Sequence, residues 1–179
     1  LVMCMVCALG FGLASVAPEF AILFYGEAFA DSGLLMALLS FTLLTIGFAN
    51  VIRTQWVLPQ KRDHIFVKSV LTGAAVNVVL NALLIPPYGA MGAVIATMAA
   101  ELAVPVVQFI ILRKELPFGR YLRYVLTYSV IGFIMYLGVR GTCWADLDPW
   151  MLLGLRVVLG AAVYCTLCAM LWMWTGNRR

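Results

Sequence analysis

The chain has 179 residues, of which 64% are hydrophobic and 11% are charged, and its mean hydropathy is +1.02. Soluble domains carry about a quarter of their residues as charges, whereas the apolar residues here form blocks of roughly the 20 residues that a helix needs to cross a bilayer. The composition therefore excludes a soluble domain and predicts an all-α, polytopic membrane helix bundle. The blocks do not alternate in polarity as the strands of a transmembrane β-barrel do.

Turn residues and charges divide the chain into about six predicted transmembrane helices. They cover residues 1–25, 33–57, 66–86, 89–112, 122–140 and 149–174. The connecting loops are short, so we expect residues 1–179 to form a single transmembrane bundle without a separate extramembrane domain. Because the chain opens in an apolar stretch without an initiator Met, we interpret it as part of a longer protein whose preceding helices are missing.

The positive charges predict an orientation in the membrane. Ten basic residues surround the second and fourth loops and the C-terminus, and one, Arg140, lies in the alternate loops. By the positive-inside rule the basic loops are cytoplasmic, and an even number of crossings then places both termini in the cytoplasm. Trp144 and Trp150 at the predicted outer edge are typical of an aromatic belt. The net charge of +4 follows from this bias, so we expect no nucleic-acid partner.

Polar side chains recur along one face of two neighbouring predicted helices. Asn77 and Asn81 are four residues apart and share a helix face. Thr97, Glu101 and Gln108 lie close to one line on the next helix. Lipid cannot satisfy such groups, so this face must point to other helices or to a water-filled cavity. For the asparagines, packing between helices is the alternative to a cavity role, whereas an acid in mid-membrane is a functional candidate.

Three further residues are candidates for the same cavity. Asn50 belongs to a weaker polar stripe on the second predicted helix, and Arg53 continues that stripe towards the cytoplasm. Arg156 lies about two turns into the last predicted helix from its outer end. Snorkelling of the side chain to the lipid headgroups is the alternative role for both arginines.

The sequence offers no catalytic or metal-binding pattern that we would assign. Two CxxC spacings, at residues 4–7 and 165–168, lie in apolar spans without acids or histidines nearby. In such spans cysteine packs as a small hydrophobic residue, so we expect no metal and no cofactor. No nucleophile has an adjacent base, and we therefore expect no enzymatic activity.

A succession of motifs covers residues 54–102. A basic loop follows the helix end TQWVLP, the pattern N-x3-N-x-x-L-I-P closes the next helix, and a Tyr-Gly turn leads to the pattern G-A-x-I-A-T-x-x-x-E. This succession resembles Wzx-type lipid-linked oligosaccharide flippases, polysaccharide biosynthesis proteins of the MOP superfamily, which also contains the MATE exporters. The resemblance implies a MATE-like transporter of two helix bundles, of which this chain would be the C-terminal one and the N-terminal bundle would be missing.

The resemblance also implies a function. Two bundles would rock around a central cavity and carry an undecaprenyl-pyrophosphate-linked oligosaccharide across the bacterial inner membrane, for O-antigen, capsule or exopolysaccharide assembly. The cavity amides and Glu101 would meet sugar hydroxyls, and Arg53 and Arg156 would be nearest to the pyrophosphate. The implied partners are the lipid-linked substrate, the phospholipid bilayer, the N-terminal bundle and, as a further candidate, the polysaccharide polymerase machinery.

Three other functions stay open. A MATE-like ion-coupled exporter of small cations would share the fold and would favour acids over arginines in its cavity. A membrane glycan polymerase or ligase would place basic catalytic residues in a long outer loop, whereas the predicted outer loops are short. A purely structural subunit predicts that Glu101→Ala alters stability, whereas a flippase predicts that transport is lost while assembly stays intact.

Overall fold

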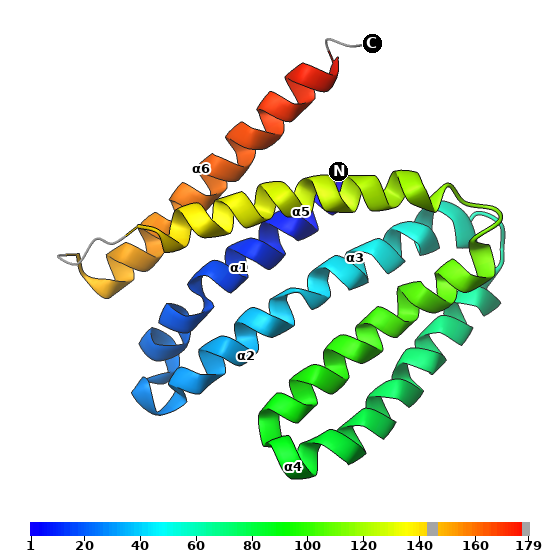
Figure 1. Ribbon diagram of the computed structural model, residues 1–179, viewed down its shortest axis with the longest axis horizontal. Coiled ribbons are helices and arrows are strands. Elements are labelled where there is room, and N and C mark those ends of the chain that lie inside the picture. Colours follow the sequence, from blue (N-terminus) through cyan, green and yellow to red (C-terminus); the bar gives the residue numbers. More distant parts are fainter. Residues whose placement is uncertain (143–146, 177–179) are drawn as a thin grey trace.

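A computed structural model describes residues 1–142 and 147–176 as a set of long helices joined by short turns (Figure 1). In chain order the elements are α1 (Val2–Tyr25), the 3₁₀ turn η1 (Glu27–Phe29), α2 (Ala30–Ser40), α3 (Thr42–Ile52), the π-helical turn η2 (Arg53–Val57), α4 (Asp63–Leu112), α5 (Phe118–Arg140) and α6 (Pro149–Gly176). Within the described residues, five helical stretches are long and apolar enough to cross a membrane: Val2–Tyr25, Glu27–Val57, Asp63–Leu112, Phe118–Arg140 and Pro149–Thr175. The prediction of an all-α chain with helices able to span a membrane is confirmed.

The predicted helices 66–86 and 89–112 form one element, α4, which turns back on itself (Figure 1). Helical geometry continues through Pro86 and Pro87 and is broken at Gly89, with φ 54° and ψ −132°. Glycine adopts a positive φ without the steric cost that other residues meet. Beyond the turn the chain runs antiparallel to its first part, so α4 consists of two limbs, residues 63–88 and 90–112.

The second predicted helix begins earlier than expected and is divided. α2 starts at Ala30, and the break before α3 falls at Phe41. There the hydroxyl of Ser40 donates to the carbonyl of Gly10 in α1 at 2.9 Å, which ties the bend to the neighbouring helix. The stretch ends in the π-turn η2, where the Leu58 amide donates to the Arg53 carbonyl at 2.9 Å.

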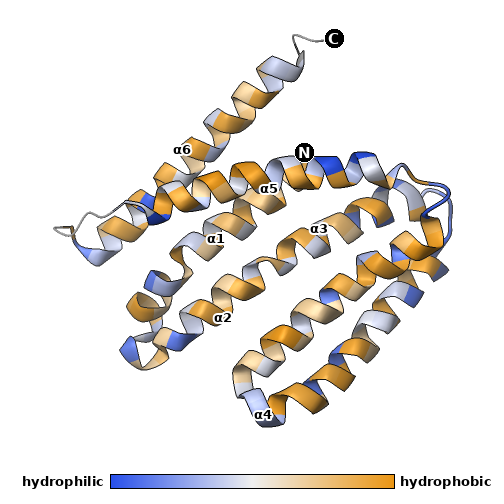
Figure 2. Ribbon diagram, in the orientation of Figure 1, coloured by the Kyte–Doolittle hydropathy of each residue, from blue (hydrophilic) through white to orange (hydrophobic). Residues whose placement is uncertain are grey.

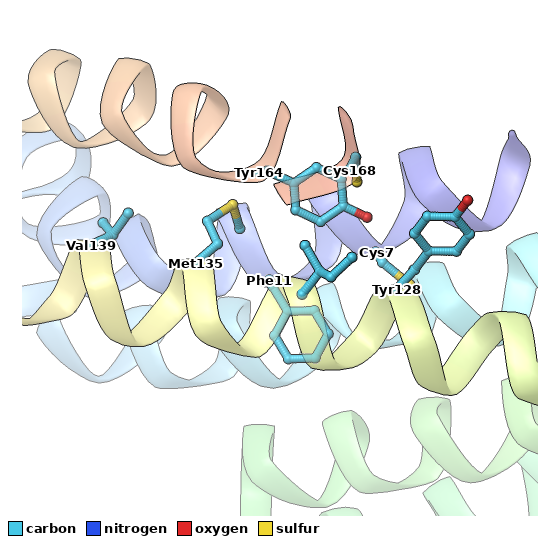
Figure 3. Packing of buried hydrophobic residues seen from close by; sticks show 8 residues of the cluster. Cys7, Phe11, Tyr128, Met135, Val139, Tyr164 and Cys168 are labelled. Atoms are coloured by element: carbon cyan, nitrogen blue, oxygen red, sulfur yellow. The ribbon is translucent and has the colours of Figure 1, made fainter. Parts of the chain in front are cut away.

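The first long helix and the last two, α1, α5 and α6, share one hydrophobic core (Figure 3). Its buried members come from α1, α5 and α6: Cys7, Phe11, Tyr128, Ile131, Met135, Val139, Tyr164 and Cys168. The Tyr164 hydroxyl donates to the Cys4 carbonyl at 2.7 Å, and the sulfur atoms of Cys4 and Cys168 are 3.7 Å apart. These contacts hold α6 against α1.

Hydrophilic residues gather at the ends of the helices, whereas the helix sides are largely apolar (Figure 2). At one end Glu115 accepts a hydrogen bond from Arg62 at 2.5 Å and one from the Trp56 indole at 3.3 Å. The second and fourth loops, which carry most of the basic residues, therefore meet at the same end of the molecule. The predicted belt residue Trp144 lies outside the described residues, as do the two C-terminal arginines.

Candidate substrate cavity

A cavity of about 490 Å³ lies between α3 and the two limbs of α4. Four of the predicted lining residues meet in it: Asn50 from α3, Asn77 from the first limb, and Thr97 and Glu101 from the second. The remaining wall is apolar and is formed by Ile46, Ala49, Phe66, Val70, Gly73, Ala74, Ala100 and Val104. Polar side chains from three helical segments thus converge on one hollow.

Small residues let the limbs of α4 approach closely enough to shape this cavity. A Cβ atom placed on Gly73 would lie 2.8 Å from the Cγ2 atom of Val104 and 3.1 Å from the carbonyl oxygen of Ala100. Nearer the turn, a Cβ atom on Gly92 would overlap the carbonyl group of Leu84. Larger residues at these points would force the limbs apart.

The two asparagines take different positions relative to the cavity. The Asn81 amide nitrogen donates to the Asn77 side-chain oxygen at 2.9 Å, so Asn81 lies behind Asn77 and orients its amide. With its oxygen engaged, Asn77 keeps its own amide N–H groups as donors toward the cavity. The Asn81 side-chain oxygen is buried and has no hydrogen-bond partner among the described residues.

Thr97 and Glu101 supply hydrogen-bond acceptors to the cavity. The Thr97 hydroxyl donates to the Ala93 carbonyl of its own helix at 2.9 Å, so its oxygen lone pairs are what it can offer a ligand. Glu101 is partly buried, and within residues 1–142 and 147–176 its carboxylate makes no hydrogen bond or ion pair. The carboxylate is thus free to accept hydrogen bonds from hydroxyl or amine groups of a ligand.

Arg53 is placed at the edge of the cavity wall. Its guanidinium carbon lies 4.1 Å from the centroid of the Phe66 ring, and Phe66 lines the cavity. Such a cation–π contact fixes the plane of the guanidinium group, while the N–H groups at its rim stay available for an anion. Arg53 is also the first residue of the π-turn η2, a distortion often found at functional sites.

Besides Arg53 and Asn81, two further predicted residues, Gln108 and Arg156, do not line the cavity. Gln108 is fully buried between the limbs of α4, where its amide donates to the Ser69 hydroxyl at 3.4 Å. Arg156 lies elsewhere in the bundle, with Nη1 2.8 Å from Glu19 Oε1 and Nη2 donating to the Thr142 carbonyl at 3.4 Å. Glu19 also accepts a hydrogen bond from Arg140 at 2.9 Å, so it bridges two arginines.

Sequence reasoning missed Phe66 as the platform of Arg53 and Glu19 as the partner of Arg156. Phe66, Val70, Gly73 and Asn77 follow one another at helical spacing, so extending the Asn77 face by three turns towards the basic loop would have found Phe66. Glu19 and Arg156 both lie near the predicted outer ends of their helices, and their opposite charges at similar depth were the available signal.

No group of three or more His, Cys, Asp or Glu side chains that could hold a metal ion occurs in the part of the chain that the structure describes. Comparison of the chain with protein-family models, with curated proteins and with solved structures found no match.

Proposed function

We propose that this chain is one bundle of a flippase that moves lipid-linked oligosaccharides across the bacterial inner membrane. In this proposal each limb of α4 crosses the membrane once, which gives six crossings with the basic loops in the cytoplasm. The second bundle is the N-terminal one that the family resemblance implies. The cavity beside α4 would form part of the central path for the glycan.

The observation that carries the proposal is the gathering of Asn50, Asn77, Thr97 and Glu101 around one cavity. Amides, a hydroxyl and a carboxylate are the groups that hydrogen-bond sugar hydroxyls. Arg53 supports an anionic end to the substrate, because its guanidinium group flanks the same wall through Phe66 and can bind a pyrophosphate in a bidentate manner. Arg156 is occupied by Glu19 at 2.8 Å and takes no part in our proposal.

A MATE-like exporter of small cations is the second candidate, and one observation favours it. The described wall of the cavity contains the carboxylate of Glu101 and no Lys or Arg side chain. An acid without a counter-charge in a cavity with a largely apolar wall attracts an organic cation. The exporter would use the same cavity and would not need Arg53.

Complementation tests the flippase directly. The gene that encodes this chain would be expressed in a bacterium that lacks its own flippase, and surface polysaccharide would be measured. We expect restoration by the parent protein and loss of polysaccharide with Glu101→Ala and with Thr97→Val at unchanged membrane abundance. Thr166→Val is the matched control, because it removes an equivalent hydroxyl from the exposed side of α6.

Each alternative gives a different pattern in the same strains. If the parent fails in hosts with several different repeat units but raises resistance to cationic drugs, and Glu101→Ala abolishes that resistance, the protein is the exporter. If Glu101→Ala lowers only the amount of folded protein, and transport per molecule is unchanged, the residue has a structural role. If Thr166→Val reduces polysaccharide as much as Thr97→Val does, the loss does not arise from the cavity.

A further inference from the structure

A second hollow lies on the other side of α3 and of the second α4 limb, and it differs in chemistry from the polar cavity. It has a volume of about 400 Å³ and is bounded by α3, α4 and α5. Its wall is apolar except for Thr45, whose hydroxyl donates to the Thr42 carbonyl of its own helix at 2.8 Å. With that hydroxyl proton engaged, the groove offers hydrocarbon contacts and suits an alkyl chain.

The groove opens along its side to the surface that would face lipid. Leu102 and Leu122, one from each flanking helix, are 54% and 55% exposed although they line the groove. At one end of the groove Phe109 of α4 packs against Phe118 of α5, with ring centroids 4.8 Å apart. An acyl chain could therefore enter sideways from the bilayer and lie along a preformed surface.

Free positive charge sits at one end of this groove. Arg113 follows Phe109 by four residues, so it continues the groove-lining face of α4 one turn further. Residues 113–123 contain four cations and one acid, and that acid, Glu115, is already paired with Arg62 at 2.5 Å. Arg113, Lys114, Arg120 and Arg123 are exposed and make no ion pair among the described residues.

We propose that this groove is a binding site for an anionic phospholipid, with one acyl chain between α4 and α5 and the headgroup phosphate on Arg113. Basic pockets between helices on the cytoplasmic side of membrane proteins bind anionic headgroups in this way. Mass action also favours this occupant, because a site that opens to the bilayer fills with the most abundant amphiphile of matching charge. The site rests on contacts separate from those of the polar cavity.

Native mass spectrometry of the purified, delipidated chain would test the site. The probes are a phosphatidylglycerol and a phosphatidylcholine with identical acyl chains, added together in equal amount. We expect phosphatidylglycerol to be bound in preference, and Arg113→Gln to lower its binding about fivefold, as expected for one cation at the membrane surface.

Gly119→Trp tests the groove itself. Gly119 lines the groove, and a Cβ atom there meets no atom within 4 Å. We therefore expect the indole to occupy the groove and to abolish retention of the lipid. Gly138→Trp is the control, because Gly138 lies on the same helix, is equally open and lies outside the groove.

Three results would overturn the site. If Gly119→Trp retains as much lipid as the parent, the lipid does not bind in the groove. If phosphatidylcholine binds as well as phosphatidylglycerol, the headgroup charge plays no role. Displacement of phosphatidylglycerol by an equal amount of a polyprenyl phosphate would assign the groove to another lipid class. Folding of each variant is checked by circular dichroism, and Arg113→Gln keeps the test decisive if the tryptophan variant fails to fold.

Discussion

Gly92 lies where the two limbs of α4 meet beside the turn, and replacing it by alanine adds a single methyl group at this contact. An added Cβ atom would overlap the carbonyl group of Leu84, and a backbone group cannot move away by changing rotamer. We therefore expect Gly92→Ala to push the limbs apart and to destabilise the protein.

The size of the effect follows from two opposing contributions. Alanine is favoured over glycine in a helix by about 1 kcal/mol, whereas overpacking costs about 1–3 kcal/mol, and backbone crowding places Gly92 in the upper part of that range. The net result is a destabilisation of about 1–2 kcal/mol. Gly138→Ala is the matched control, since a Cβ atom there meets nothing within 4 Å, and it should stabilise by about 0.5–1 kcal/mol.

Reversible unfolding in mixed micelles, followed by helical circular dichroism as the fraction of denaturing detergent rises, gives both values in one assay. The two alanine variants should shift the midpoint in opposite directions. If Gly92→Ala proves as stable as Gly138→Ala, the limbs are not packed as closely as we describe, and the shape of the polar cavity between them would have to be revised.

Three further results are expected. Glu19→Gln should lower the free energy of unfolding by about 2 kcal/mol, less than the roughly 3–5 kcal/mol lost when a fully buried ion pair is broken, because 32% of the Glu19 side chain is exposed. Arg140→Gln should lower it by less than about 1 kcal/mol. Equal losses for the two variants in the same unfolding assay would contradict this ordering. Hydrogen bonds from an arginine and from an indole lower the pKa of Glu115 below its ordinary value of 4.5, so its contribution to stability is present above that value and is lost as the pH falls through the lowered pKa. Unfolding midpoints measured from about pH 6 to about pH 3 should fall more steeply for the parent than for Glu115→Gln, and parallel curves would refute the linkage. Mild oxidation should join Cys4 to Cys168, whose sulfur atoms are 3.7 Å apart, with loss of two free thiols by mass spectrometry and no such loss in Cys168→Ser; absence of the cross-link in the parent would refute the packing of α6 on α1.

Much of the fold was predictable because membrane helices are long and uniformly apolar. The turn within α4 was expected at the Tyr-Gly pair between the two predicted helices, and the break falls at Gly89. The start of α5 at Phe118 was missed by four residues against the predicted 122. The charged stretch before it reads as a loop, whereas Phe118 is drawn into the helix by a buried position against Phe109 and Leu112.

The site was only partly predictable, because helical spacing assigns a face without telling where a cavity ends. Gln108 lies on nearly the same face as Glu101, seven residues further along α4. The limbs close over it, and its amide meets Ser69 instead of the cavity. Arg156 shows a different limit, since a cation in a predicted span has the same signature whether it meets a ligand or a carboxylate of another helix. The pairing depends on how α1 and α6 pack, which spacing within one helix does not contain.

The separation between Arg53 and Asn77, at the far end of the cavity, bears on the choice between flippase and exporter. Arg53 stacks on Phe66, and Phe66 precedes Asn77 by eleven residues of the same helix, which corresponds to roughly 16 Å along its axis. A small organic cation cannot bridge such a distance, whereas a substrate with an anionic end and a hydroxyl-rich body can touch both places. Arg53→Gln should therefore reduce polysaccharide export in the complementation assay while leaving any cation resistance unchanged. The opposite pattern, with intact polysaccharide in Arg53→Gln, would leave the guanidinium group at the headgroups and shift the assignment towards the exporter.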